Sequence, residues 1–443
     1  MTVRIMNLVA PLSHKDTDMH TTDTAAQVAD RSGAVSSPSI QRGDVDSANK
    51  RPSIRISTTA IRTTTTFLPS VESEPSADSS NYSFELLLRA YLDCRKHKRN
   101  SGSALAFEQN LERNLWKLHG ELIDGSYQPG RSVCFVITRP KPREVWAADF
   151  RDRIVHHLFY NRVSPRFHAS FIADSCACIP GRGTMYAGER LEAKIRSVTQ
   201  NWSRPAFYLK CDLANFFVAI DKNILRSLLE KRITEPFWLA LADTILFHNP
   251  RLNFEYRGSV DLLDRVPAHK RLTNHPAHLG LPIGNLSSQF FANVYLNELD
   301  QFCKHQVCAK HYIRYVDDFI LLHESPQWLN EAHRRVEAFL PDHLGAMLNP
   351  KKTILQPVDR GVDFVGQVIR PWSRTTRRRT FNEAIRRVGT IDSADLFETA
   401  NSYFGLLRQA GHSHHDRARL ANVLRRRGHC INKQFTKTYR RAA

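Results

Sequence analysis

Residues 312–322 read Tyr-Ile-Arg-Tyr-Val-Asp-Asp-Phe-Ile-Leu-Leu, and the interpretation of the whole chain starts from this stretch. β-branched and aromatic residues flank the acidic pair on both sides, a pattern that predicts strand, turn and strand. Asp317 and Asp318 fall where the tight turn is expected, and Asp is a favourable turn residue. The segment is therefore predicted to be a β-hairpin with two adjacent carboxylates at its tip.

Two adjacent carboxylates repel each other unless a cation lies between them. Mg²⁺ prefers oxygen ligands and is commonly held by one or two carboxylates together with substrate phosphates. The pair therefore has two interpretations, a metal site for phosphoryl chemistry or a solvent-exposed turn. The hairpin alone does not decide between them.

The charge of the chain favours a polyanionic partner. Its 443 residues, enough for two or three domains, carry a net charge of +19. Residues 371–443 hold 16 Lys or Arg against 5 Asp or Glu and thus supply +11 of that total. Such an excess is typical of proteins that bind nucleic acid.

Other classes of protein fit the sequence poorly. No apolar run is long enough to span a bilayer, and the first residues lack the apolar core of a secretory signal. We therefore expect a cytoplasmic protein without a membrane partner. The eight cysteines are scattered and include no C-x-x-C spacing, so free buried thiols are expected rather than a zinc site.

Composition and hydrophobic spacing divide the chain into four regions. The first 80 residues include 24 Ser or Thr and no Trp, which favours disorder, although a mis-assigned start codon would also explain such a leader. Later regions alternate helical spacing, strand patterns and basic loops. The expected regions are a leader (1–80), a helical region with a basic loop at 139–143 (81–200), a strand-containing region with a loop-rich insertion at 249–279 (201–370), and a basic helical region (371–443).

A third carboxylate ends an earlier predicted strand. Asp212 follows the strand pattern of residues 207–211, about a hundred positions before the Asp-Asp pair. If the two strands are neighbours, three carboxylates converge and could hold two Mg²⁺ ions. Lys141, Arg143 and Lys352 could then neutralise the remaining charge of a triphosphate.

Six blocks of sequence make the family resemblance specific. In order, they resemble the motifs of a reverse transcriptase. The resemblance implies an α+β right-hand polymerase, with helical and loop-rich fingers (81–200), an antiparallel palm sheet backed by helices (201–370), and a small helical thumb (371–443). The blocks are PKPREV (140–145), CDLANFF (211–217), LPIGNLSSQ (281–289), YVDD (315–318), LNPKKT (348–353) and DFVGQVI (363–369).

Within that family the chain looks most similar to bacterial enzymes of diversity-generating retroelements, on FRDRIVHH (150–157), LPIGNLSSQ and GVDFVG (361–366). The resemblance implies two Mg²⁺ ions, which Mn²⁺ could replace, and it assigns a role to each matching residue. The implied metal ligands are Asp212, Asp317, Asp318 and the Leu213 carbonyl; Lys352 is the implied proton donor to pyrophosphate; Lys141, Arg143, Phe217, Ile283 and Gly284 are implied nucleotide contacts; and Tyr315, Gln289 and Arg182 are implied primer or template contacts.

Two of these positions predict substrate choice. Phe217 matches the position whose ring crowds a 2′-hydroxyl, so deoxynucleotides are expected as substrates. Ile283 stands where many reverse transcriptases have Gln, and an apolar side chain cannot form the hydrogen bonds by which Gln keeps nucleotide and template in register. The resemblance therefore implies error-prone copying.

The expected activity is RNA-directed DNA synthesis from dNTPs on an RNA template with a DNA or RNA primer. Two biological settings stay open. One is mutagenic retrohoming with a non-coding RNA and a small accessory protein; the other is antiphage defence with templated or untemplated synthesis. A non-catalytic RNA-binding scaffold is the alternative outside enzymology.

Overall fold

A computed structural model describes residues 82–96, 98, 101–139 and 141–439. The predicted disordered leader, residues 1–80, lies outside the described residues. Within the described ranges, no helix combines the length and apolar character that crossing a membrane requires.

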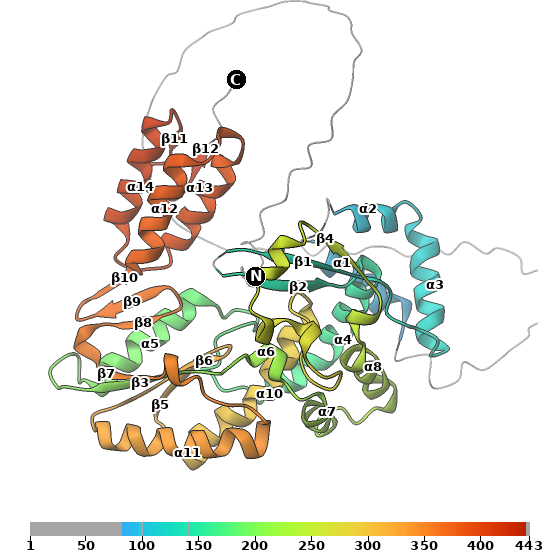
Figure 1. Cartoon of the computed structure of the whole chain (residues 1–443), viewed down its shortest axis with the longest axis horizontal. Helices are drawn as coiled ribbons and strands as arrows, with labels where there is room; N and C mark the ends of the chain where they lie inside the picture. Colours follow the sequence, from blue (N-terminus) through green and yellow to red (C-terminus); the bar gives the residue numbers. More distant parts are fainter. Residues whose placement is uncertain (1–81, 97, 99–100, 140, 440–443) are drawn as a thin grey trace, which may run out of the picture. The chain divides into compact units, whose positions relative to one another are not determined.

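The centre of the fold is a four-stranded antiparallel sheet with the strand order β5-β6-β3-β7 (Figure 1). Strands β5 and β6 are the two arms of the predicted hairpin, with Tyr315 paired with Asp318, so that prediction is confirmed. The sheet consists of β3 (Phe207–Asp212), β5 (His311–Tyr315), β6 (Asp318–His323) and β7 (Ile354–Pro357).

Helices cover both faces of this sheet because apolar residues occupy both faces of its strands. Leu209 and Leu321 join the large core that contains α10 (Leu286–Gln301) and α11 (Pro326–Leu344). Their neighbours Tyr208 and Ile320 point the other way, into a second core with α5 (Thr184–Val198). Figure 1 shows α5 and α11 on opposite sides of the strands.

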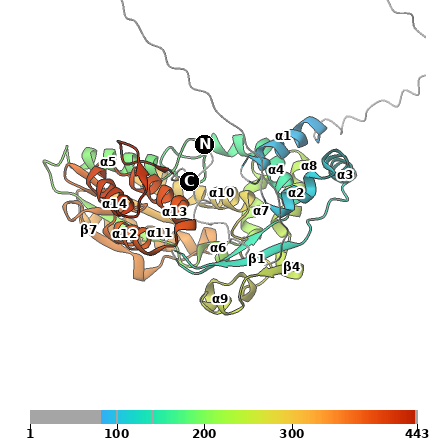
Figure 2. The same cartoon turned by 90° about the horizontal axis from the view of Figure 1, so that it is seen from above.

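The region before the palm sheet packs helices against a small sheet. The loop-rich insertion predicted at 249–279 contributes a strand to that sheet, β4, which pairs in parallel with β1, and Figure 2 shows α9 just beyond it. The turn-forming residues of this insertion gave no indication of a strand. The elements here are α1 (Phe84–Arg95), α2 (Gly102–Glu108), α3 (Leu111–Ile123), β1 (Ser132–Ile137), β2 (Arg143–Ala147), α4 (Phe150–His168), β4 (Phe254–Arg257) and α9 (Asp261–Asp264).

Residues 222–248 contain two helices that pack against α4 and α10. Asp221 begins the first of them, since its carboxylate accepts hydrogen bonds from the Asn223 and Ile224 amides. The elements between β3 and β4 are α6 (Phe216–Ala219), α7 (Lys222–Glu230) and α8 (Pro236–Phe247).

The C-terminal region contains a three-stranded sheet and a helical bundle with its own core, formed by residues such as Phe381, Leu396, Phe404 and Leu420. Residues 371–443, predicted to be a basic helical region, contain three helices in their described part. The elements are β8 (Val362–Phe364), β9 (Gln367–Arg370), β10 (Ser373–Thr376), α12 (Arg378–Thr390), α13 (Ser393–Leu407), α14 (His414–Arg426), β11 (Cys430–Ile431) and β12 (Thr438–Tyr439).

Candidate active site

Three acidic residues meet at one end of the palm sheet. Strand β3 pairs with β6 so that Asp212 lies directly opposite Asp318. The Leu213 amide donates a hydrogen bond to the Asp317 carbonyl over 3.3 Å. The two strands are therefore neighbours, as predicted, and the adjacency brings together residues more than a hundred positions apart in the sequence.

The hairpin turn that carries Asp317 has an unusual backbone. Val316, the first of its two turn residues, has φ +56°. A β-branched residue is rarely found in this left-handed region, and such a conformation costs on the order of 1–3 kcal/mol. The surrounding structure must therefore fix the turn, and Arg314 Nη1 does so by donating to the Val316 carbonyl over 3.0 Å.

The carboxylates at this edge of the sheet repel one another, and this repulsion shifts their pKa values. Burial, together with the negative charges of Asp212 and Asp318, raises the pKa of Asp317 to about 6. Burial also raises the pKa of Asp318, although the nearby Lys210 and Lys352 act in the opposite direction. Carboxylates held close together in spite of this repulsion are typical of sites that function with a bound cation.

A short basic turn holds Asp212 from the other side. The Asn349 amide donates to the Asp212 carbonyl over 2.8 Å, and Lys352 Nζ forms an ion pair with Asp212 Oδ1. Lys352 therefore lies beside the acids, whereas the resemblance to reverse transcriptases implied a place near the leaving pyrophosphate. Its role as a proton donor stays a prediction.

The donor set suits a hard divalent cation, since the side chains that meet here offer carboxylate oxygens only. Within the described part of the chain, however, no group of three or more His, Cys, Asp or Glu side chains is already arranged to hold an ion. Lys352 takes up one oxygen of Asp212. A metal ion at Asp212 would therefore compete with Lys352 for that oxygen.

Two backbone hydrogen bonds hold the segments that carry the predicted nucleotide contacts Phe217 and Ile283. The Leu281 amide donates to the Phe217 carbonyl over 2.8 Å, and the Trp146 amide donates to the Ile283 carbonyl over 2.7 Å. These two bonds join the 281–284 turn to β2 and to α6, the short helix that follows β3.

Gly284 is needed for the close approach of that turn to β2. It has φ +131°, and a Cβ at this position would lie 2.9 Å from Val145 Cγ1. Any other residue would therefore push the turn away from β2. Gly284 thus allows the turn to pack closely against β2, and its contact with a nucleotide stays a prediction.

The two predicted triphosphate contacts lie at the start of β2. Lys141 and Arg143 are exposed, and neither has a carboxylate partner among the described residues. Pro140, between them and Arg139, lies outside those residues. Their binding of phosphate stays a prediction.

The three predicted primer or template contacts have different surroundings. The Tyr315 ring packs edge-on against Phe364, with ring centroids 6.4 Å apart. Arg182 Nη1 donates to the carbonyls of Ile172 and Ser175, each over 2.7 Å, so this side chain also has a structural task. Gln289 is half-buried on α10. The structure leaves the nucleic-acid roles of all three as predictions.

Sequence reasoning missed Lys210. Its Nζ donates to the Asp363 carbonyl over 3.0 Å, and its charge favours the ionised form of Asp318. Because side chains alternate along a strand, Lys210 lies on the same face of β3 as Asp212. That spacing of two was the available signal.

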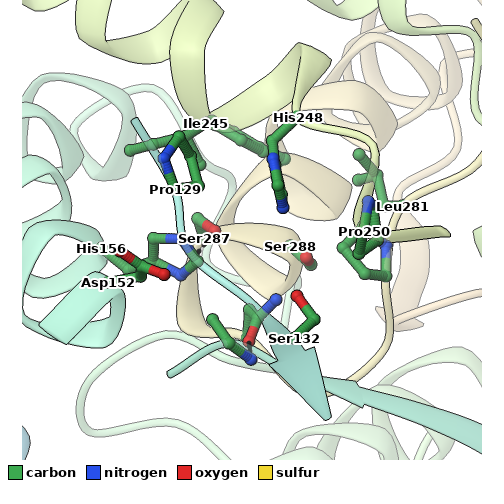
Figure 3. Close-up of a pocket in the computed structure, with 14 residues that line it drawn as sticks. Pro129, Ser132, Asp152, His156, Ile245, His248, Pro250, Leu281, Ser287 and Ser288 are labelled. Atoms are coloured by element: carbon green, nitrogen blue, oxygen red, sulfur yellow. Dashed lines mark hydrogen bonds between the residues drawn. The ribbon is translucent and has the colours of Figure 1, made fainter. Parts of the chain in front are cut away.

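A small cavity lined by both polar and apolar side chains lies beside the start of α10 (Figure 3). Its volume is about 20 Å³, enough for roughly one water molecule. Asp152, His156, His248, Ser287 and Ser288 line it, and the Ser287 hydroxyl lies 3.3 Å from His156 Nδ1. Burial lowers the pKa of His156 to about 3, so this side chain is uncharged at neutral pH.

Comparison with known proteins gives one family and several distant structures. Residues 139–369 match the family described as reverse transcriptase (RNA-dependent DNA polymerase), and no curated protein matches the chain. Telomerase from Candida albicans, in complex with the TWJ fragment of telomeric RNA, is 11% identical with a TM-score of 0.38, covering 67% of this chain and 56% of its own. Apo telomerase from Candida tropicalis is also 11% identical, with a TM-score of 0.41 and coverages of 67% and 57%. The chain thus spans little more than half of these telomerases, and at such scores the likeness supports no argument about function.

Proposed function

Because the chain belongs to the reverse transcriptase family, whose members are RNA-directed DNA polymerases, we propose that it copies an RNA template into DNA by transferring deoxynucleotides to a primer. The observation that carries the proposal is the meeting of Asp212, Asp317 and Asp318 at one edge of the palm sheet. The raised pKa of Asp317 supports it, since these acids repel one another without a cation.

Asp212, Asp317 and Asp318, with the Leu213 carbonyl, would hold two Mg²⁺ ions, and Mn²⁺ could replace them. When bound, such ions lower the pKa of an attacking hydroxyl and neutralise charge on the leaving phosphate. Lys352, now paired with Asp212, would turn to the pyrophosphate and supply its proton. The metal ions would thereby take the place of the Lys352 ammonium at Asp212, and Lys352 would be free to donate its proton to pyrophosphate.

The chain's other residues would select and orient the nucleotide. Phe217 would crowd a 2′-hydroxyl and so exclude ribonucleotides, and Lys141 and Arg143 would neutralise the triphosphate. Ile283 would contact the nucleotide through an apolar side chain, which cannot form a hydrogen bond with it. We therefore propose low copying fidelity.

The proposed partners are an RNA template, a DNA or RNA primer and dNTPs. We further propose a diversity-generating retroelement as the setting, with a non-coding RNA and a small accessory protein, in a bacterial cytoplasm. The support for this setting is the motif resemblance alone. A template and variable repeat pair beside the gene would agree with it, and an isolated defence locus would favour antiphage synthesis instead.

Primer extension with purified protein tests the activity. Wild-type protein with RNA template, primer, dNTPs and Mg²⁺ should give DNA that depends on template sequence. Asp317→Asn should abolish the product, whereas Asp359→Asn, the same change at an exposed position, should not. Equal synthesis by the Asp317→Asn protein would contradict the proposal, and product without template would favour untemplated synthesis.

A further inference from the structure

Directly behind the acidic hairpin lies an ion pair that is fully removed from water. Arg314, on β5, is 1% exposed and Asp300, on α10, is 0% exposed. Arg314 Nε and Nη2 donate to the two oxygens of Asp300 over 2.7 and 2.6 Å, the two-pronged geometry that suits a guanidinium. The Tyr312 hydroxyl donates to the same carboxylate over 2.7 Å.

Every N–H of this guanidinium has an acceptor. Besides Asp300, Nη2 donates to the Ser175 hydroxyl over 2.9 Å, and Nη1 donates to the Asn293 side chain over 3.3 Å and to the Val316 carbonyl over 3.0 Å. Arginine offers five N–H donors in a rigid plane, and all five are used here. The orientation of the group is therefore fixed, and no lysine could reproduce it.

One of these five bonds leaves the core and reaches the turn. Val316 precedes Asp317 and has the strained φ of +56°, so its carbonyl direction determines where the next peptide and the Asp317 side chain lie. On the other side, the Leu213 amide holds the Asp317 carbonyl. The turn is thus held between the strand that carries Asp212 and the buried guanidinium.

We propose that Arg314, anchored on Asp300, is the positioning residue of the acidic hairpin, because it fixes the Val316 carbonyl and thereby the orientation of the Asp317 carboxylate. This inference rests on the proposed function for its effect on catalysis. Arg314 lies in the core and does not touch substrate. A carboxylate displaced by about 1 Å can cost a hundredfold in rate, so a small loosening of the turn should be visible in kcat.

Two neighbouring substitutions separate positioning from general stability. Arg314→Lys keeps the charge opposite Asp300 but cannot also reach the Val316 carbonyl. Tyr312→Phe removes another hydrogen bond to the same Asp300 oxygen and leaves the turn contact in place. In primer extension, Arg314→Lys should lower kcat by about tenfold to a hundredfold with KM for dNTP within about twofold, whereas Tyr312→Phe should keep kcat within about twofold. Equal losses in both variants, or wild-type kcat in Arg314→Lys, would overturn the inference.

Hydrogen exchange of the turn gives a readout that needs no catalysis. The amides of residues 315–318 should exchange faster in Arg314→Lys than in wild type, and those in Tyr312→Phe should not; unchanged exchange in Arg314→Lys would overturn the inference. A wild-type protein that synthesises no DNA would refute the proposed function. Hydrogen exchange of the turn would still test whether Arg314 positions it. If Arg314→Lys does not fold, Ser175→Ala removes one acceptor without unpairing the charge. It should then raise exchange in the turn and lower kcat by about threefold, and no change in either would count against the proposal.

Discussion

Two groups of carboxylates in the molecule differ in what surrounds them. At the edge of the palm sheet, the half-buried Asp317 and Asp318 face Asp212. Burial and the charge of Asp212 raise the pKa values of both, and Asp318 also raises the pKa of Asp317. The carboxylates of the second group are buried and paired with basic side chains. Asp300 pairs with Arg314, and Asp174 accepts hydrogen bonds from Lys194 over 2.8 Å and from Arg190 over 2.7 Å.

The pKa of Asp174 shows what such partners do. Burial alone would raise that pKa, but hydrogen bonds and positive charge from Lys194 and Arg190 hold it below its usual value. Carboxylates whose charge is already matched belong to the framework. Those whose charge is not matched lie where the chemistry of the family requires added cations.

The largest expected effect separates activity from stability at the front edge. Asp318→Asn should lower DNA synthesis by about a thousandfold, because a ligand and a charge are lost from the site. Its free energy of unfolding should stay the same or rise, since one source of repulsion disappears. Primer extension and urea denaturation measure the two quantities. A variant that loses stability in step with activity would end the contrast between the groups.

The second effect is a loss of stability at the buried Asp300–Arg314 pair. Asp300→Asn leaves the buried Arg314 without its counter-charge, so we expect the free energy of unfolding to fall by about 3–5 kcal/mol. Urea denaturation of the variant beside Asp359→Asn, an exposed control, gives the difference. A loss below about 1 kcal/mol would show that this pair is not part of the framework.

A third kind of buried group, a histidine that burial keeps uncharged, sharpens the comparison through pH. Burial and the positive charges nearby lower the pKa of His156 to about 3 in the folded protein, whereas it titrates near 6.5 when unfolded. The unfolded chain therefore takes up the proton first, and stability is lost as pH falls below about 6.5, by about 2 kcal/mol at pH 5.

His156→Gln should remove that part of the pH dependence. Thermal or urea unfolding at several pH values between 7 and 5 measures it, with wild type in parallel. An identical slope in the two proteins would mean that His156 already binds its proton in the fold.

The smallest effect concerns the choice of base. Ile283→Gln should lower the misincorporation frequency severalfold, because the amide can hydrogen bond where the natural side chain cannot. Sequencing of the cDNA from a defined template gives the frequency for both proteins. Equal, low error in the two would exclude Ile283 as the cause of infidelity.

The front of the palm could be predicted from sequence because its signals are local. Asp212 and the Asp317–Asp318 pair each follow or interrupt a strand pattern, and the order of the motif blocks supplied the pairing of the strands. Gly284 and Lys352 lie in those same blocks. The structure brings Asp212, Asp317, Asp318 and Lys352 together, whereas the chemical roles of these residues and of Gly284 stay proposals.

The back of the palm could not be predicted in this way. In the sequence, Asp300 is one polar residue near the end of a buried helix, and Arg314 is one residue of a strand. Only the tertiary packing shows that Arg314 donates two hydrogen bonds to the Asp300 carboxylate. Strand β4 was missed for a related reason, since its residues pair with β1 across more than a hundred positions and lie among turn-forming residues.

The location of bound metal tests the central claim most directly. Fe²⁺ can take the place of Mg²⁺ and, with ascorbate and peroxide, cleaves the protein backbone near the bound ion. We predict cuts close to residues 212–213 and 316–318 in the wild-type protein, and their loss in Asp317→Asn but not in Asp359→Asn. Cuts elsewhere, or the same cuts in all three proteins, would contradict a metal site at this edge of the palm sheet.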